Sequence, residues 1–277
     1  MPMAGVGTPT TGGSGNTGIC VTCAEYLLIC LACGQPVHGK YIEINAGGTG
    51  SSDGPYCEAC YRDRPPCDVC GAPLTNDHWQ LSDGRLSCGY CHATAIYGPA
   101  EAKNLYEEMK SVVAQQIGLS LNIPTGLALV DRVQLEDIIR QQVESAKPTS
   151  FPSGTISSAS EEALDPQRTL GIYARRGIRR GIYVQTGLPR LLLMQVAAHE
   201  FAHAWQGENC PLLRDTLVRE GFAEWVAYKI LGYYGHTRGQ AHMQARTDLY
   251  GQGLRWALAL ESNQGIPAIF EACRMVN

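Results

Sequence analysis

Hydrophobic residues recur at helical spacing in the second half of the chain. Between residues 189 and 205 there is proline at the start, no breaker inside, and one apolar face formed by Leu192, Leu193, Val196, Ala197 and Phe201. This pattern is typical of a helix with a buried side. Residues 216–231 form a second such stretch, with Asp215 as an N-cap and Gly232 at the end. Two neighbouring helices are therefore expected.

The remaining stretches mix the two periodicities and predict an α+β fold. Residues 101–118 carry one helical stripe, formed by Leu105, Met109, Val112, Val113 and Ile117. Residues 127–139 are expected to begin as a strand and end as a short helix, and residues 170–185 to form two short strands around a turn. Residues 147–166 are rich in Ser, Pro and Thr and are expected to be a surface loop. Residues 1–18 have almost nothing apolar to bury and are expected to be a disordered tail.

Cysteine spacing changes this picture, because ten of the twelve cysteines fall in five Cys-x-x-Cys pairs. The phrase Cys-x-x-Cys-Gly-x-Pro begins at Cys30 and again at Cys67, and a second pair follows each time. Each unit predicts a treble-clef finger with a tetrahedral zinc site. A finger of this size has little core of its own, and a structural zinc contributes ~10–16 kcal/mol to folding. The two predicted ligand sets are Cys30, Cys33, Cys57 and Cys60, and Cys67, Cys70, Cys88 and Cys91.

Two alternatives concern the cysteines. A RING would interleave the pairs across two zinc ions, whereas the tandem repeat favours sequential sites. Cys20 and Cys23 lack a second pair: they are the remnant of an earlier finger, metal ligands together with His38, or free thiols. Cys210 and Cys273 are single and are expected to be free, buried thiols.

The first of the two helices carries His199-Glu200-Phe-Ala-His203. The two histidines are four residues apart, so their imidazoles share one helix face and can bind one zinc ion at roughly 2.0–2.1 Å. Glu200 lies about 100° further round, where it can act on a water without binding the metal. A catalytic zinc needs a third protein ligand, and Glu220 on the second helix is the candidate. Glu224, one turn later, is expected to hydrogen-bond one histidine and fix its tautomer.

These residues carry a resemblance to known families. His-Glu-x-x-His followed by Glu220-Gly-Phe-Ala resembles the gluzincin metallopeptidases, which implies a thermolysin-like domain with Glu220 as the third ligand. The segment Gly187-Leu-Pro-Arg-Leu-Leu before the motif is similar to that of the LIM-domain peptidases that limit organ growth in plants. The cysteine repeat resembles a LIM domain in which the bridge between fingers is longer and cysteines replace a histidine ligand.

The resemblance also implies roles for residues outside the two helices. Tyr250-Gly-Gln-Gly is similar to the phrase whose tyrosine donates to the oxyanion in the aminopeptidase N family, and His236 is the substitute candidate. In gluzincins the edge strand before the metal-binding helix pairs with the substrate backbone, and here this strand is expected to be Ile182, Tyr183 and Val184.

Composition and charge exclude some classes of function. A hydrophobic content of 44% can form a sizeable core, and the net charge of −4 gives no general attraction to nucleic acid or an anionic membrane. The first basic residue is Lys40 and no apolar run approaches the roughly 18–20 residues of a membrane span, so a cytoplasmic location is expected. Arg175, Arg176, Arg179 and Arg180 form either a solvated turn or a contact for acidic substrate residues.

The sequence thus predicts a tail at 1–18, a LIM-like tandem zinc-finger domain at 19–97 and a metallopeptidase domain at 98–277. One catalytic and two structural zinc ions are expected, with Glu200 as general base in the hydrolysis of peptide bonds. The expected partners are a protein or peptide substrate and a protein bound by the fingers, for which a ubiquitin-like protein is one option. The alternatives are a non-catalytic zinc-finger adaptor and a RING-like ubiquitin-pathway module. Endopeptidase and aminopeptidase action both stay open.

Overall fold

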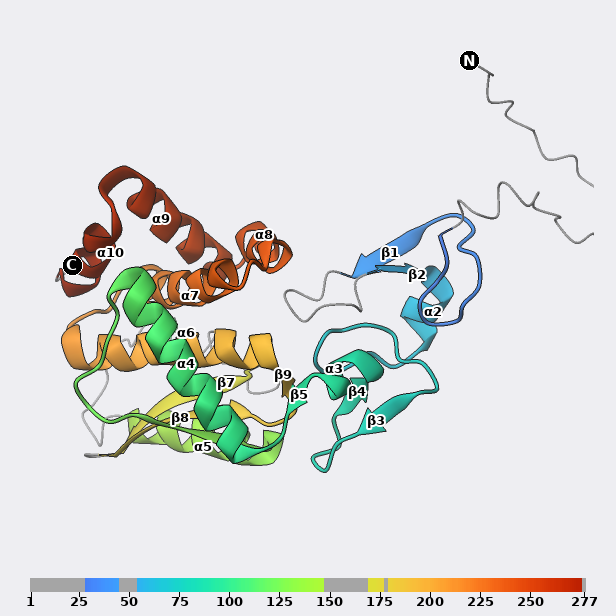
Figure 1. The fold of residues 1–277 in the computed structure, drawn as a ribbon, viewed down its shortest axis with the longest axis horizontal. Coiled ribbons are helices and arrows are strands. Elements are labelled where there is room, and N and C mark those ends of the chain that lie inside the picture. The colour runs from blue at the N-terminus through green and yellow to red at the C-terminus, as the bar shows by residue number, and fades with distance from the viewer. Residues whose placement is uncertain (1–27, 45–53, 147–168, 177–178, 276–277) are drawn as a thin grey trace, which may run out of the picture.

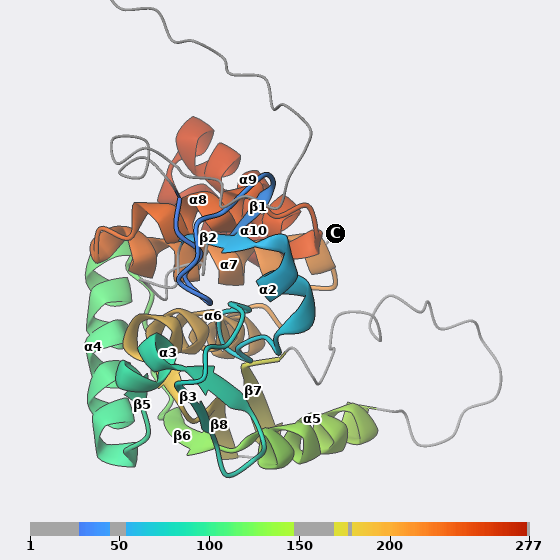
Figure 2. The same cartoon turned by 90° about the vertical axis from the view of Figure 1, so that its right-hand side faces the viewer.

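The computed structural model describes residues 28–44, 54–146, 169–176 and 179–275. Two fingers lie beside one end of a helical part (Figure 1), and Figure 2 shows the same arrangement from the side of the fingers. The predicted tail, Cys20 and Cys23, and the predicted surface loop at 147–166 lie outside the described residues. Residues 98–277 were expected to be the second domain. The expected boundary falls at the start of the first long helix, of which Gly98 is the N-cap.

Both fingers have the same order of elements: a cysteine knuckle, an antiparallel hairpin and a short helix. In the first finger these are β1 (Tyr41–Ile44), β2 (Gly54–Cys57) and α2 (Glu58–Asp63). In the second they are β3 (His78–Gln80), β4 (Leu86–Cys88) and α3 (Gly89–Ala93). The glycine after each knuckle is in the left-handed region, with φ of 69° at Gly34 and 75° at Gly71. This explains why glycine recurs in the repeated phrase.

The helical part stacks its elements in layers (Figure 1). A three-stranded sheet has the order β6-β8-β7, where β6 and β8 are parallel and β7 and β8 antiparallel. Helix α5 covers one face of this sheet and α6 the other, while α7 and α9 follow beyond α6. The bounds are α4 (Pro99–Ile117), β6 (Gly126–Val130), α5 (Arg132–Ala146), β7 (Gly171–Arg176), β8 (Arg179–Gln185), α6 (Arg190–Asn209), α7 (Thr216–Tyr233), α8 (Thr237–Ala245), α9 (Leu249–Gln264) and α10 (Ile266–Arg274).

Alternation along β8 shows how the sheet separates two hydrophobic clusters. Ile182 and Val184 are fully buried in the main core with α6, whereas Tyr183 points to the other face and packs with Leu135 and Ile139 of α5. Successive side chains of a strand point to opposite faces, so β8 contributes side chains to both hydrophobic clusters. The predicted helices at 101–118, 189–205 and 216–231 and the two strands at 170–185 are confirmed.

One expectation about the sheet is wrong. Ile182, Tyr183 and Val184 were expected to form an edge strand, but β8 is hydrogen-bonded to β6 on one side and to β7 on the other. Its backbone groups are therefore already paired. Among the described strands of this sheet, β7 lies at the edge beside α6.

Helices α7 and α9 cross where each has a glycine. A Cβ added to Gly221 would lie 2.6 Å from the carbonyl oxygen of Gly253, and one added to Gly253 would lie 2.7 Å from the Cα of Gly221. Only glycine permits this approach of two backbones. None of the helices in the described parts of the chain has the length and apolar character needed to span a bilayer.

Candidate metal centres

The eight knuckle cysteines form two clusters of four, in sequential order, as predicted. Within each cluster all Sγ atoms lie within 4.8 Å of one another. Cys70 Sγ and Cys88 Sγ are 3.8 Å apart. Zn–S bonds of about 2.3 Å in a tetrahedron require sulfur atoms about 3.8 Å apart, so this separation fits zinc. The interleaved arrangement of a RING is not the one observed.

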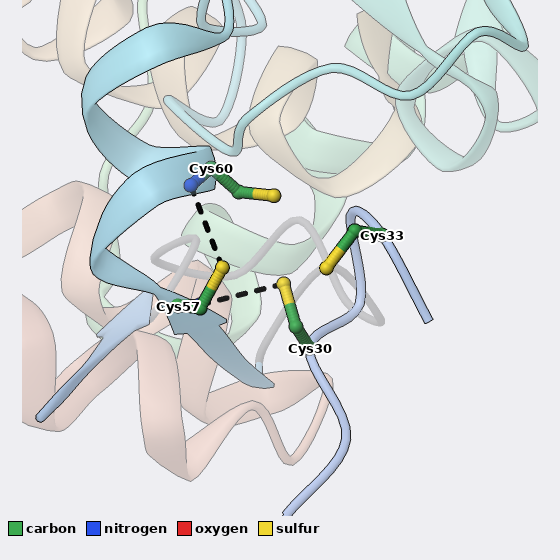
Figure 3. Close-up of side chains that lie close together, drawn as sticks. All are labelled: Cys30, Cys33, Cys57 and Cys60. Carbon is green, nitrogen blue, oxygen red and sulfur yellow. Dashed lines mark hydrogen bonds between the residues drawn. The ribbon is translucent and has the colours of Figure 1, made fainter. Parts of the chain in front are cut away.

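Backbone N–H groups favour the anionic form of one thiol of the first finger, that of Cys30. Cys57 N donates to Cys30 Sγ at 3.4 Å and Cys60 N donates to Cys57 Sγ at 3.5 Å (Figure 3). Burial raises the pKa of the Cys30 thiol, but the hydrogen bonds from backbone N–H groups outweigh burial and bring that pKa down to about 6. Burial raises the pKa of the Cys60 thiol to about 12, so the first finger has one thiol that ionises readily and one that does not. A thiolate is the form that binds metal.

A third cluster joins α6 to α7. His199 Nε2 and His203 Nε2 are 3.1 Å apart, and Glu220 Oε2 lies 3.5 Å from the first and 3.3 Å from the second. Three donors about 2.0–2.1 Å from one zinc ion in tetrahedral geometry lie about 3.3–3.4 Å apart, so the three atoms fit such an ion. This is the ligand set expected from the sequence, and the residues can hold a metal ion.

Each of the three ligands is held by a second side chain. His199 Nδ1 lies 3.3 Å from Glu224 Oε1, the partner predicted for it. Two further supports were not predicted. His203 Nδ1 lies 2.9 Å from the side-chain oxygen of Gln206, and Arg219 donates to Glu220 Oε1 at 2.9 Å. Gln206 is three residues after His203 and so lies on the same helix face, a spacing from which its role was predictable.

The charge balance of the third cluster favours a cation. Burial lowers the pKa of His199, but hydrogen bonds to Glu220 and Glu224 outweigh it and hold that pKa well above its ordinary value. Burial raises the pKa of Glu220, and the two histidines more than reverse this, so that its pKa lies far below the usual range. With Glu200 also buried nearby, three carboxylates surround two imidazoles. Arg219, paired with Glu220, and Arg246, 3.7 Å from Glu224, balance part of this negative charge, and a divalent ion would balance the rest.

Glu200 lies beside the three ligands but is not one of them. Its Oε2 accepts a hydrogen bond of 2.7 Å from the backbone N–H of Tyr173 in β7. Gly171 of the same strand lies against the helix, because a Cβ there would be 2.5 Å from Val196 Cγ1 and 3.4 Å from Glu200 Cγ. The edge strand therefore runs directly past this carboxylate, and β7 takes the place expected for residues 182–184.

Tyr250 stands near the cluster at the start of α9. Its ring centroid is 6.1 Å from that of His199, and the guanidinium of Arg246 lies 4.8 Å over the Tyr250 ring. Burial raises the pKa of Tyr250 to about 12, which keeps its hydroxyl protonated and able to donate. His236, the substitute candidate, uses its Nδ1 to accept from Gly239 N and so caps α8.

The two single cysteines and two arginines of the predicted turn lie outside the three clusters. Cys210 and Cys273 are free and buried, as expected. Two arginines of the hairpin formed by β7 and β8 face one acidic residue at the end of α6: Arg180 forms an ion pair with Glu208, and Arg175 lies 3.8 Å from the same carboxylate. These two arginines are therefore not simply solvated.

The chain is similar to plant proteins named for LIM domains or for DA1. It is 28% identical over 216 residues to LIM domain-containing protein HDR3 of Oryza sativa subsp. japonica, covering 71% of this chain and 41% of that protein. It is 23% identical over 260 residues to Protein DA1 of Arabidopsis thaliana, covering 73% and 47%. It is 28% identical over 192 residues to Protein DA1-related 1 of the same plant, covering 62% and 34%. No protein-family model and no solved structure matches the chain.

These comparisons confirm the predicted resemblance to plant LIM-domain proteins, and the tandem clusters of four cysteines agree with LIM-like zinc fingers. The chain spans less than half the length of these relatives. The gluzincin resemblance stays a prediction.

Proposed function

We propose that the chain is a zinc-finger regulatory protein whose fingers bind another protein, and that its third metal centre hydrolyses peptide bonds. The first part is supported by the two clusters of four cysteines and by the similarity to a LIM domain-containing protein. The first finger also exposes large apolar side chains, with Leu31 at 47%, Tyr41 at 46% and Tyr61 at 50%. Exposed apolar and aromatic side chains are typical of surfaces that contact other proteins.

The hydrolytic part rests on one observation. A buried carboxylate, Glu200, lies one residue from a metal ligand, outside the ligand set, and is bonded to an edge strand. A centre that only stabilised the fold would have no use for a base at this place, and structural zinc sites have four protein ligands rather than three. When bound, zinc supplies Lewis acidity that polarises a carbonyl and lowers the pKa of water towards about 7.

The side chains of this chain then have defined tasks. Glu200 takes a proton from the attacking water as the new C–O bond forms, and gives it to the amine nitrogen as the C–N bond breaks. Tyr250 donates its hydroxyl proton in a hydrogen bond to the carbonyl oxygen as negative charge develops there. Glu224 and Gln206 orient the two histidines through their Nδ1 atoms. β7, an edge strand among the described strands, would offer its remaining backbone groups to an extended peptide.

A non-catalytic adaptor is the second candidate, and the comparisons favour it more than they favour a peptidase. The relatives are named for LIM domains and for DA1, so the similarity to them supports the role of the fingers only. In an adaptor the fingers would bind their partner in the same way, and the third centre would have a structural task.

Cleavage of a random peptide library, mapped by mass spectrometry, separates the two candidates. We expect wild type to carry three zinc ions per chain, one for each cluster, and to cleave peptides. Glu200→Gln removes the base but no ligand, so it should keep three zinc ions and lose turnover. If Glu200→Gln cleaved peptides at the wild-type rate, the mechanism would be rejected. A wild type that holds three zinc ions and cleaves no peptide would favour the adaptor.

A further inference from the structure

The second finger is hydrogen-bonded to the start of the helix that carries the two histidines. Strand β5 (Ala95–Ile96), which directly follows this finger, pairs with β9 (Leu188–Pro189), which directly precedes α6. The N–H of Arg190, the first residue of α6, donates to the carbonyl of Thr94 at 3.1 Å. In Figure 1, α3, β5 and β9 mark this junction. The first turn of α6 therefore rests on the finger.

A buried arginine of the finger also contacts this junction. Arg85 is 2% exposed and precedes β4 by one residue. Its guanidinium donates to Gln185 Oε1 at 2.9 Å and to the carbonyl of Thr186 at 2.7 Å. These two residues end β8 and lead into β9, so Arg85 fixes the point where the chain leaves the sheet for α6.

The charge of Arg85 is balanced within the finger. Asp83 accepts from Arg85 Nε at 2.9 Å, and both side chains are almost completely buried. Asp83 also accepts from the backbone N–H of Arg132, the first residue of α5, and the Arg132 side chain lies 2.9 Å from Asp68. Asp68 follows the zinc ligand Cys67 directly. A buried ion pair with its hydrogen bonds satisfied has one favourable geometry, so this contact fixes orientation.

We infer that Arg85 is a positioning residue for the three-ligand centre, and that the second finger is a structural base of that centre. The inference rests on the proposed metal centre. His199 is nine residues after Arg190, so a helix rise of 1.5 Å per residue places it about 13–14 Å along α6. A rigid helix carries a shift of its start to both histidines. Glu220 lies on α7, which packs on α9 as well as on α6 and so has a second support that α6 does not provide.

The geometry of a metal centre makes such a shift measurable. Ligand distances in metal sites vary by only about 0.2 Å, so a small movement of α6 relative to α7 separates the histidines from Glu220. Loss of the Arg85 contacts releases the end of β8 while the ligands themselves stay unchanged. The expected effect is therefore a weaker third metal site in a folded protein whose fingers still bind zinc.

The test compares metal affinity in the full chain for wild type, Arg85→Ala, Arg85→Lys and the control Arg62→Ala. Arg62 forms the same kind of ion pair, with Asp63, but its side chain is 73% exposed and lies in the first finger. Competition with a chromophoric chelator gives the zinc affinity of the third site. Co²⁺ absorption separates thiolate sites from the site without sulfur.

Arg85→Ala should lose about tenfold or more in zinc affinity at the third site, as supports of metal ligands do, while the thiolate spectrum is kept. The zinc affinity of Arg85→Lys should lie between those of Arg85→Ala and wild type. An ammonium keeps the positive charge but lacks the planar, bidentate geometry of the guanidinium. Arg62→Ala should match wild type. Wild-type affinity in Arg85→Ala would overturn the inference.

Two further outcomes have a defined meaning. If Arg85→Ala loses its helical circular dichroism, Gln185→Met replaces it as a milder change that removes one acceptor of Arg85 at this junction and leaves the carbonyl of Thr186. Wild-type zinc affinity in a folded Gln185→Met protein would then overturn the inference. Because the readout is affinity, a wild type that binds the third zinc without hydrolysis refutes the proposed peptidase and leaves the role of Arg85 intact. A wild type without a third metal site refutes both.

Discussion

The crossing of α7 and α9 makes a sharp prediction, because it holds both Glu220 and Tyr250 in place. Replacing Gly253 by alanine puts a Cβ 2.7 Å from Gly221 Cα, 2.8 Å from Gly221 N and 3.0 Å from Leu217 O. All three are backbone atoms, so no side chain can rotate aside. Ordinary contact begins near 3.4 Å, and the two helices must therefore separate by about 0.7 Å.

Two opposing effects set the size of the change in stability. Overpacking of this kind costs about 1–3 kcal/mol, and backbone neighbours place it at the upper end. Alanine in a helix interior is about 1 kcal/mol more favourable than glycine, which offsets part of that cost. The expected net loss is about 2 kcal/mol in the free energy of unfolding, equivalent to roughly 4–8 °C in Tm for a domain of this size.

Urea denaturation of the zinc-loaded protein measures this loss, and Gly207→Ala is the matched control. Gly207 lies in α6, and a Cβ there would meet Tyr173 Cε1 at 3.5 Å, an ordinary contact. The control should be as stable as wild type or more stable by up to about 1 kcal/mol. If Gly253→Ala were stabilised in the same way, the close approach of the two helices would be refuted.

Two further predictions concern the surroundings of the third metal centre. Tyr250→Phe should lower kcat by about 10²–10³-fold, the usual effect of removing one oxyanion donor, with zinc content unchanged; a rate equal to wild type in steady-state peptide hydrolysis would remove Tyr250 from the mechanism. Gln206→Ala removes the side chain 2.9 Å from His203 Nδ1, so zinc affinity at this site should fall by about 10–100-fold in chelator competition; an unchanged affinity would show that His203 needs no such support.

Much of the local structure was predictable because it follows from short-range patterns. The repeated cysteine phrase predicted both clusters, and the spacing of His199, His203 and Glu220 predicted a ligand set whose donor atoms lie close enough to share an ion. Helix α5 was expected to be short and to end near Ile139, but it continues to Ala146. Its apolar positions continue at four-residue intervals from Leu135 through Ile139 to Val143, so this signal was present in the sequence.

The order of strands was not predictable in the same way. Periodicity assigns residues to strands and faces, but it does not determine which strand pairs with which. The parallel partner of β8 is β6, which lies more than fifty residues earlier in the chain. Without that pairing, β8 would be an edge strand, as the gluzincin resemblance implied. The consequence for the site is large, because β7, and not β8, lies beside Glu200.

The contacts that place the ligands relative to one another could not be predicted from the motif alone. His-Glu-x-x-His fixes two donors on one helix, and Glu220 supplies a third on another, but the distance between the helices is a tertiary property. This distance depends on Gly221 and Gly253, which bring α9 against α7. It also depends on Arg85, which lies 114 residues before His199 in the sequence. Gly221 belongs to the Glu220-Gly-Phe-Ala part of the motif, but its partner Gly253 and Arg85 lie outside it. A motif match therefore identifies the atoms of a metal centre, whereas a helix crossing and a zinc finger determine whether those atoms converge.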